Sequence, residues 1–298
     1  MTRVWLTGAQ GMLGLALARE LARRDVDCFP TDRELDIADE TQVFAFAQRE
    51  RPSVVINAAG FTQVDLAEAE REVAFRVNGR GAGVLSRAAL DVGAPLVHVS
   101  TDYVFGGEGN TPYRETAVTA PRGVYAQSKL EGERLVLETA RAGGRVYVVR
   151  TSWLFGLHGA NFVKTMVNLM RDRDEVRVVS DQHGRPTYTE DLAEALLALV
   201  GLGGEAAAEP GVYHFANAGE TSWHGFAVAI REACLAQGLA LRAERVLAVT
   251  TAEFPRPAPR PAHSVLDTAK VEAALGKPPR PWRTALEEYL RREFPNQS

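Results

Sequence analysis

Three glycines near the start of the chain, in the segment TGAQGMLG, constrain the fold more than any other feature. Gly8, Gly11 and Gly14 follow an apolar run at residues 3–6 and precede leucines that recur every four residues. The run predicts a strand, and the leucine spacing predicts a helix that ends near Arg24. Glycines between a strand and a helix let backbone N–H groups approach a pyrophosphate at the helix N-terminus. We therefore expect a dinucleotide-binding turn rather than an ordinary glycine-rich one.

Short apolar runs alternate with longer segments of helical period through the first half of the chain. Further strands are predicted at residues 26–29, 54–57, 96–100 and 146–150. Each is separated from the next by a segment long enough for a crossover helix. This alternation predicts an α/β fold, specifically a Rossmann-type doubly wound parallel sheet, formed by residues 1–152.

The apolar spacing becomes less regular after Arg150. Residues 255–261, PRPAPRP, cannot form a helix interior or a central strand, because proline lacks an N–H donor and fixes φ. The segment that follows is too short to be a domain of its own. We expect residues 153–180 and 216–298 to form a smaller C-terminal α/β substrate lobe, and residues 181–215 to return to the first domain.

Composition limits the compartment and the class of ligand. The chain has 298 residues and a formal net charge of −4, which gives no overall attraction to nucleic acid. No apolar run approaches the roughly 18 residues of a membrane span, and residues 1–21 do not resemble a signal peptide. Cys28 and Cys234 are the only cysteines, which fits a reducing compartment. We expect a cytoplasmic protein that binds small molecules, with no membrane and no nucleic-acid partner.

The strongest chemical motif is YAQSK, in which Tyr125 and Lys129 lie four residues apart and so on one helical face. A phenol with an ordinary pKa near 10 is a poor acid-base group at neutral pH. We expect the Lys129 ammonium to stabilise the phenolate and lower the pKa of Tyr125. The alternative is a surface pair, although the chain has only four lysines.

A second polar group ends the strand predicted at residues 96–100, in the segment HVSTDYVFGG. The hydroxyls of Ser100 and Thr101 could hydrogen-bond a substrate carbonyl and orient it toward Tyr125. A cap or a turn is the structural alternative for both residues. Together with the glycine turn and Lys129, this arrangement predicts catalysis.

Residues after the second and third strands bear on the choice of cofactor. Asp32 favours NADH, because an acid binds the ribose hydroxyls, whereas Arg33 favours NADPH, because a cation accepts the extra phosphate. Asp36 resembles an acid beside the adenine, and helix capping explains it equally well. We expect NADPH, with NADH as the alternative. The expected cofactor-binding residues are Gly8, Gln10, Gly11, Met12, Leu13, Asp32, Arg33, Asp36, Ile37, Ala58, Ala59, Gly60, Tyr125 and Lys129.

These motifs resemble the extended short-chain dehydrogenase/reductase superfamily and, within it, the dTDP-4-dehydrorhamnose reductases. The resemblance covers nearly the whole chain and is carried by INAAGFTQVDLAEAE, FRVNGRGAGVLSRAA, STDYVF, VYAQSKLEGE, VVRTSWLFG, DQHGRPT and RPAHSVLDTAKV. It implies an oxidoreductase that uses NAD(P)H to reduce the C4 keto group of dTDP-4-dehydro-L-rhamnose. The implied product is dTDP-L-rhamnose, a polysaccharide precursor.

The same resemblance implies roles for particular residues. Thr101, Tyr125 and Lys129 would be catalytic, and Asn78 would support a proton path through Lys129. Arg260 would contact the substrate diphosphate, because guanidinium groups bind phosphate bidentately. The implied substrate-binding residues are Thr101, Asp102, Tyr125, Trp153 and Arg260, and those between the cofactor and substrate lobes are Gln182, Pro186 and Thr187. Core packing for Trp153 and an exposed arginine at 260 are the structural alternatives.

The sequence departs from the family at one position. Some members are described as dimers bridged by magnesium, with a carboxylate two residues beyond the last glycine of the nucleotide turn. Here that position is Ala16. We therefore expect no metal site, and a homodimer, if one forms, without a magnesium bridge.

Three other functions found in the superfamily fit this sequence less well. A dehydratase would carry Asp-Glu after the threonine, whereas here Asp102 and Tyr103 follow Thr101. A combined epimerase-reductase would need another acid-base pair, for which His183 is the one candidate. A regulatory subunit of methionine adenosyltransferase stays open as a non-enzymatic alternative, although the retained Tyr125 and Lys129 favour an enzyme.

Overall fold

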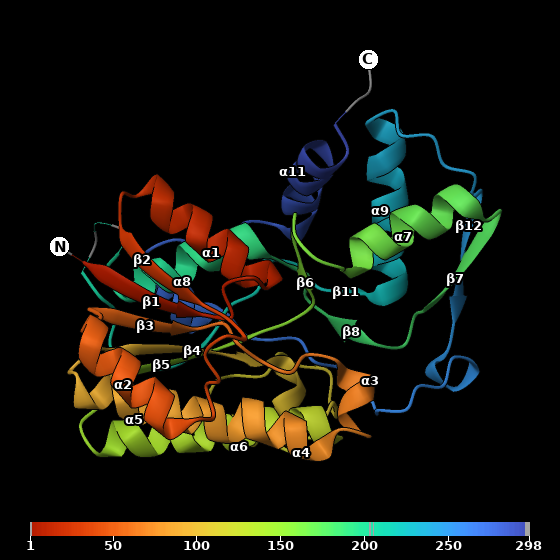
Figure 1. Ribbon diagram of the computed structural model, residues 1–298. Helices are drawn as coiled ribbons and strands as arrows, with labels where there is room; N and C mark the ends of the chain where they lie inside the picture. The colour runs from red at the N-terminus through yellow and green to blue at the C-terminus, as the bar shows by residue number, and fades with distance from the viewer. Residues whose placement is uncertain (1, 203, 205, 296–298) are drawn as a thin grey trace.

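A six-stranded parallel sheet lies at the centre of the computed structural model, which describes residues 2–202, 204 and 206–295 (Figure 1). The strand order is β10-β5-β4-β3-β1-β2. The strands are β1 (Arg3–Thr7), β2 (Asp27–Thr31), β3 (Val54–Asn57), β4 (Leu96–Thr101), β5 (Val146–Thr151) and β10 (Gly211–His214). The predicted α/β fold class is confirmed.

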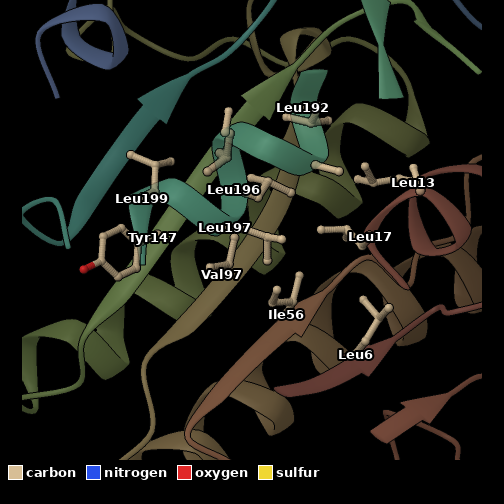
Figure 2. Close-up of a cluster of buried hydrophobic side chains, with 14 of the residues drawn as sticks. Leu6, Leu13, Leu17, Ile56, Val97, Tyr147, Leu192, Leu196, Leu197 and Leu199 are labelled. Atoms are coloured by element: carbon tan, nitrogen blue, oxygen red, sulfur yellow. The ribbon is translucent and has the colours of Figure 1, made fainter. Parts of the chain in front are cut away.

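Helices cover both faces of this sheet, as the doubly wound pattern requires (Figure 1). One face carries α1 (Met12–Arg23) and α8 (Thr189–Leu199). The other carries α2 (Glu40–Glu50), α5 (Ala82–Asp91) and α6 (Val124–Arg141). Successive side chains of a strand point to opposite faces, so Leu6 packs in the first core and Trp5 in the second. Figure 2 shows leucines of α1 and α8 packed over Leu6, Ile56 and Val97 of the sheet.

Four of the predicted strands end later than expected, because each finishes on a buried threonine. Thr7, Thr31, Thr101 and Thr151 close β1, β2, β4 and β5 and are at most 6% exposed. The apolar runs used for prediction stop before these polar residues. The polar strand ends lie along the edge of the sheet where ligands bind in this fold.

A second core lies in the later part of the chain. Here α7 (Phe162–Asp172), α9 (Trp223–Ala236) and α11 (Trp282–Glu293) pack with the paired strands β7 (Glu175–Val179) and β12 (Arg245–Val249). Figure 1 shows this group beside the central sheet. Between its segments the chain returns to the sheet, where α8 packs on α1 and β10 pairs with β5.

The remaining elements are short. They are α3 (Val64–Ala67), α4 (Arg71–Ala74), the π-helix η1 (Phe75–Gly81), the 3-10 helices η2 (Asp102–Val104) and η3 (Thr251–Glu253), α10 (Ala269–Leu275), β6 (Leu154–Phe155), β8 (His183–Gly184), β9 (Thr187–Tyr188) and β11 (Thr221–Ser222). No helix among the described residues is long and apolar enough to cross a membrane.

Candidate active site

The glycine turn between β1 and α1 leaves no room for a side chain at Gly8 or Gly14. Gly8 has φ +68°, and a Cβ there would lie 2.5 Å from the backbone nitrogen of Ala59. A Cβ at Gly14 would lie 2.1 Å from the carbonyl oxygen of Gly8. No side chain caps α1 at Gly11, and its first turn holds no acidic residue. The helix N-terminus therefore suits an anionic group such as a diphosphate.

A buried polar network supports this turn from below. The Thr7 hydroxyl donates to Asn57 Oδ1 over 2.9 Å, and the Ala59 backbone N–H donates to the same oxygen over 3.1 Å. Asn57 Nδ2 lies 3.0 Å from Nδ1 of His98. Burial lowers the pKa of His98 well below its usual value, so the ring is neutral at neutral pH. This network joins the ends of β1 and β3 to β4, and no motif in the sequence indicates it.

Asp32 and Arg33, the two residues that bear on the choice of cofactor, have different surroundings. Asp32 accepts hydrogen bonds from the backbone N–H groups of Gln10 (2.9 Å) and Arg33 (3.0 Å), which draws it to the glycine turn. The Arg33 side chain is exposed. Asp36 accepts from the Ala38 backbone N–H over 3.0 Å and also pairs with Arg76.

The other cofactor candidates surround the same turn. Ala58 and Gly60 follow β3, with the Ala58 backbone N–H donating to the Thr7 carbonyl oxygen over 3.1 Å. The side chains of Leu13 and Ile37 are only 6% exposed and pack in the two cores of the sheet. These two residues can therefore meet a ligand mainly through their backbone.

Helix α6 carries Tyr125 in its first turn. Glu68, at the end of α3, accepts a hydrogen bond from the Val124 backbone N–H over 2.8 Å and so anchors the helix N-terminus. The Tyr125 ring lies edge-on to Tyr103, with centroids 6.0 Å apart. Withdrawal from water raises the pKa of Tyr125 to about 12, although the adjacent Thr101 hydroxyl opposes this shift. The structure thus brings the end of β4 and the start of α6 together.

One expectation about this pair is wrong. The YAQSK motif predicts that Lys129 lowers the pKa of Tyr125, whereas burial raises it. The Lys129 Nζ donates to the backbone carbonyl oxygen of Val99 over 2.6 Å, so the ammonium is held against β4. Burial also lowers the pKa of Lys129 to about 8. Burial is the largest influence on the pKa of both groups.

Asp102 is the most perturbed carboxyl beside the pair. Its side chain is buried, and Oδ1 accepts a hydrogen bond from the Thr101 hydroxyl over 3.1 Å. Burial raises its pKa to about 7. Tyr103 stands where a dehydratase would carry a glutamate, and burial raises the pKa of its phenol. No second carboxyl is therefore available at that position.

Asn78, expected to support a proton path through Lys129, has its hydrogen bonds elsewhere. Its Oδ1 accepts from the Phe61 backbone N–H over 2.8 Å. Its Nδ2 donates to the Phe61 carbonyl oxygen over 3.0 Å and to the Ser128 hydroxyl over 2.9 Å. These bonds brace the loop after β3 against α6.

Trp153 lies where the chain leaves the sheet after β5. It has φ +49°, a strained backbone conformation for a bulky residue. Its indole stacks on Trp223 of α9, with ring centroids 3.6 Å apart and planes within 9°. A Cβ at Gly184 would lie 2.6 Å from the indole. The indole thus joins the sheet edge to the second core.

Arg260 is bound by the protein itself. Its Nη1 donates to Asp65 Oδ1 and to the Ala258 carbonyl oxygen, both over 2.6 Å. Among the other expected residues, Gln182 Nε2 donates to the Thr251 hydroxyl over 2.9 Å. Pro186 is buried, and the Thr187 backbone N–H donates to the Trp153 carbonyl oxygen over 3.2 Å. The structure therefore places these residues around the junction of the two cores.

Comparison with known proteins identifies the family. The family model described as "RmlD substrate binding domain" matches residues 2–294. The dTDP-4-dehydrorhamnose reductase of Streptomyces griseus is 45% identical over 286 residues, covering 95% of this chain and 92% of its own. The chain belongs to the dTDP-4-dehydrorhamnose reductase family. The resemblance inferred from sequence is confirmed.

Two further relatives of this reductase family support the assignment. The spore coat polysaccharide biosynthesis protein SpsK of Bacillus subtilis is 43% identical, covering 97% of both chains. A crystal structure of dTDP-4-dehydrorhamnose reductase from Bacillus anthracis in complex with NADP has a TM-score of 0.89 and 38% identity. That similarity covers 98% of this chain and 100% of that one.

The position for which the sequence predicts no magnesium ligand lies on α1. Ala16 is buried in α1, and one turn further Arg19 pairs with Glu190 of α8. Across the described part of the chain, no group of three or more histidine, cysteine or acidic side chains is arranged to hold a metal ion.

Proposed function

We propose that this chain catalyses the NAD(P)H-dependent reduction of the C4 keto group of dTDP-4-dehydro-L-rhamnose to dTDP-L-rhamnose. The observation that carries the proposal is the meeting of Thr101 on β4 with Tyr125 on α6, with Lys129 one turn further along the helix. Full-length similarity to several dTDP-4-dehydrorhamnose reductases supports the substrate class.

The reaction divides between the cofactor and three side chains. Reduced nicotinamide, when bound, supplies the hydride for the keto carbon. Tyr125 donates its hydroxyl proton to the carbonyl oxygen, and its raised pKa keeps that proton in place at neutral pH. The Thr101 hydroxyl, which must turn from Asp102 to the substrate, donates a hydrogen bond that orients and polarises the carbonyl. Lys129 places a positive charge beside β4 and offers a donor for the nicotinamide ribose.

The cofactor we favour is NADPH, with NADH as the alternative. The open N-terminus of α1 after Gly11 would hold the diphosphate. The exposed Arg33 guanidinium suits the extra phosphate, whereas Asp32 is engaged by the backbone of Gln10. The relative from Bacillus anthracis was solved with NADP.

The division of the chain follows from the way it crosses between the two cores. We assign residues 1–152 and 181–215 to cofactor binding, because α8 and β10 join the central sheet. We assign residues 153–180 and 216–298 to substrate binding, with Trp153 lining the pocket. Arg260 contacts the substrate diphosphate in this proposal, which requires it to leave or share Asp65.

A cytoplasmic location is part of the same proposal. Cys28 and Cys234 are both free thiols in the structure. Free thiols are typical of a reducing compartment.

The test is NADPH oxidation, followed by the absorbance of the reduced nicotinamide, on addition of dTDP-4-dehydro-L-rhamnose. We expect turnover in the wild type, and a loss of at least about a hundredfold in Tyr125→Phe, because the proton donor is removed. NADPH binding, measured by fluorescence, should be largely unchanged in the variant. Equal loss of binding and turnover would contradict the role of Tyr125. Binding without oxidation in the wild type would favour another keto sugar or the regulatory-subunit alternative.

A further inference from the structure

A buried ion pair lies one helical turn beyond Lys129. The side chains of Glu133 on α6 and Arg150 on β5 are 1% and 5% exposed. Arg150 donates from Nη2 to Glu133 Oε2 over 2.7 Å and from Nε to Oε1 over 3.0 Å. Burying two charges costs so much solvation that such a pair stabilises a fold little compared with apolar residues. The contacts of the ion pair with other residues therefore matter more than its own contribution to stability.

Glu133 also binds the strand that carries Thr101. The Ser100 hydroxyl donates to Glu133 Oε1 over 2.5 Å. Ser100 is the residue before Thr101 at the end of β4. Hydrogen bonds to a carboxylate are among the stronger ones in proteins, particularly in a dry environment. The carboxylate thus connects α6 to the backbone that sets the position of the Thr101 hydroxyl.

The same carboxylate lies in line with the other functional residues of α6. Tyr125, Lys129 and Glu133 follow one another at intervals of four residues and so occupy one face of the helix. The negative charge of Glu133 opposes the effect of burial, which lowers the pKa of Lys129 to about 8. Glu133 therefore helps to keep the ammonium charged.

The other ionisable groups near Lys129 do not supply it with a negative charge. Those on the elements packed against α6 are His98 on β4, Asp102 and Tyr103 on η2, Tyr147 and Arg150 on β5, Arg76 and Arg80 on η1, Asp65 on α3, Arg71 and Glu72 on α4, and Arg87 and Asp91 on α5. The Tyr147 hydroxyl donates to the Ala208 carbonyl oxygen. His98 is neutral, because burial lowers its pKa. The charge of Asp102 raises the pKa of Tyr125. The groups on η1, α4 and α5 are exposed, and Asp65 pairs with Arg260.

We propose that Glu133 is a positioning residue for the reductase reaction: it holds the Thr101 end of β4 against α6 and supplies the negative charge beside Lys129. Arg150 holds the carboxylate in place through its two hydrogen bonds. Glu133 itself does not touch the reacting atoms. The inference rests on the proposed function, because that function gives Thr101 and Lys129 their roles.

Two variants of the full chain separate the two contributions. Ser100→Ala removes the contact to β4 and leaves the ion pair, so we expect kcat to fall about tenfold with the KM for NADPH unchanged. Glu133→Gln combined with Arg150→Gln removes both charges together, which avoids leaving Arg150 buried and unpaired. In this double variant we expect Lys129 to lose its proton about one pH unit lower, and the high-pH limb of kcat to move with it.

The titration of Lys129 can be followed without turnover, by NMR of lysines labelled with ¹³C at Cε in a chain that has only four of them. The matched control is Glu138→Gln, which removes an exposed partner of Arg134 from the same helix. It should leave kcat and the titration unchanged. A folded double variant in which Lys129 titrates as in the wild type overturns the charge role, and wild-type kcat in Ser100→Ala overturns the contact role. A wild type that oxidises no NADPH overturns the proposed function instead, while the NMR titration still decides the effect of Glu133.

Discussion

Asp102 lies 2% exposed at the start of η2, with one carboxylate oxygen bonded to Thr101 and the other buried without a hydrogen-bond partner among the described residues. Burial raises its pKa from 3.8 to about 7. The folded state therefore holds this proton over a pH range in which the unfolded chain releases it. The contribution of Asp102 to stability is lost progressively as the pH rises from about 4 to about 7.

We expect Asp102→Asn to gain stability relative to the wild type as the pH rises. An amide of nearly the same shape has no charge to desolvate, so the difference in unfolding free energy should grow by about 2–4 kcal/mol between pH 4 and pH 7. Urea unfolding at both pH values measures it. We also expect kcat to fall, because the residue neighbours Thr101. A difference independent of pH would show that the carboxyl titrates normally in the folded state.

Individual residues could be predicted from sequence where their chemistry depends on spacing along the chain. Tyr125 and Lys129 are recognisable because four residues make one helical turn. The role of the Glu133 carboxylate could not be predicted, although it continues the same interval, because its partners Ser100 and Arg150 lie on strands β4 and β5. The direction of the Tyr125 pKa was also missed, since desolvation depends on packing that no local motif reveals.

At the scale of elements, the turn from β1 to α1 depends on close backbone contact. We expect Gly14→Ala to weaken NADPH binding more than tenfold, because its Cβ would meet the Gly8 carbonyl oxygen at 2.1 Å and displace the turn. Fluorescence titration with NADPH measures the change. The matched control is Gly79→Ala in η1, where the nearest atom to the added Cβ would be Cγ of the flexible Glu131 side chain, at 3.1 Å. Its stability should stay within about 1 kcal/mol of the wild type, and equal NADPH binding in both variants would refute the steric argument.

Element positions in the first half were predictable because apolar runs and helical periods alternate there. The ends of the strands were not, since each closes on a polar residue whose partner is a neighbouring strand, such as Thr7 beside Thr31. The π-helix η1 was also beyond prediction. Its place follows from packing against α6, where Asn78 bonds Ser128.

For the whole molecule, the testable property is how copies of the chain associate. Ala16 supplies no carboxylate, and one turn further along α1 Arg19 pairs with Glu190. We expect the sedimentation coefficient to be the same with magnesium and with excess EDTA. A dimer that dissociates on chelation and re-forms when magnesium is restored would contradict this expectation.

The pairing of β10 with β5 has a consequence for synthesis on the ribosome. Until residue 214 has emerged, β5 is an unpaired sheet edge, and without α8 the leucines of α1 lack their covering layer (Figure 2). An open edge of this kind can pair with other chains. The first 150 residues hold most of the sheet, yet the nascent sheet stays incomplete for more than 60 residues of further translation. A pause in that interval would expose the chain to chaperones or to aggregation.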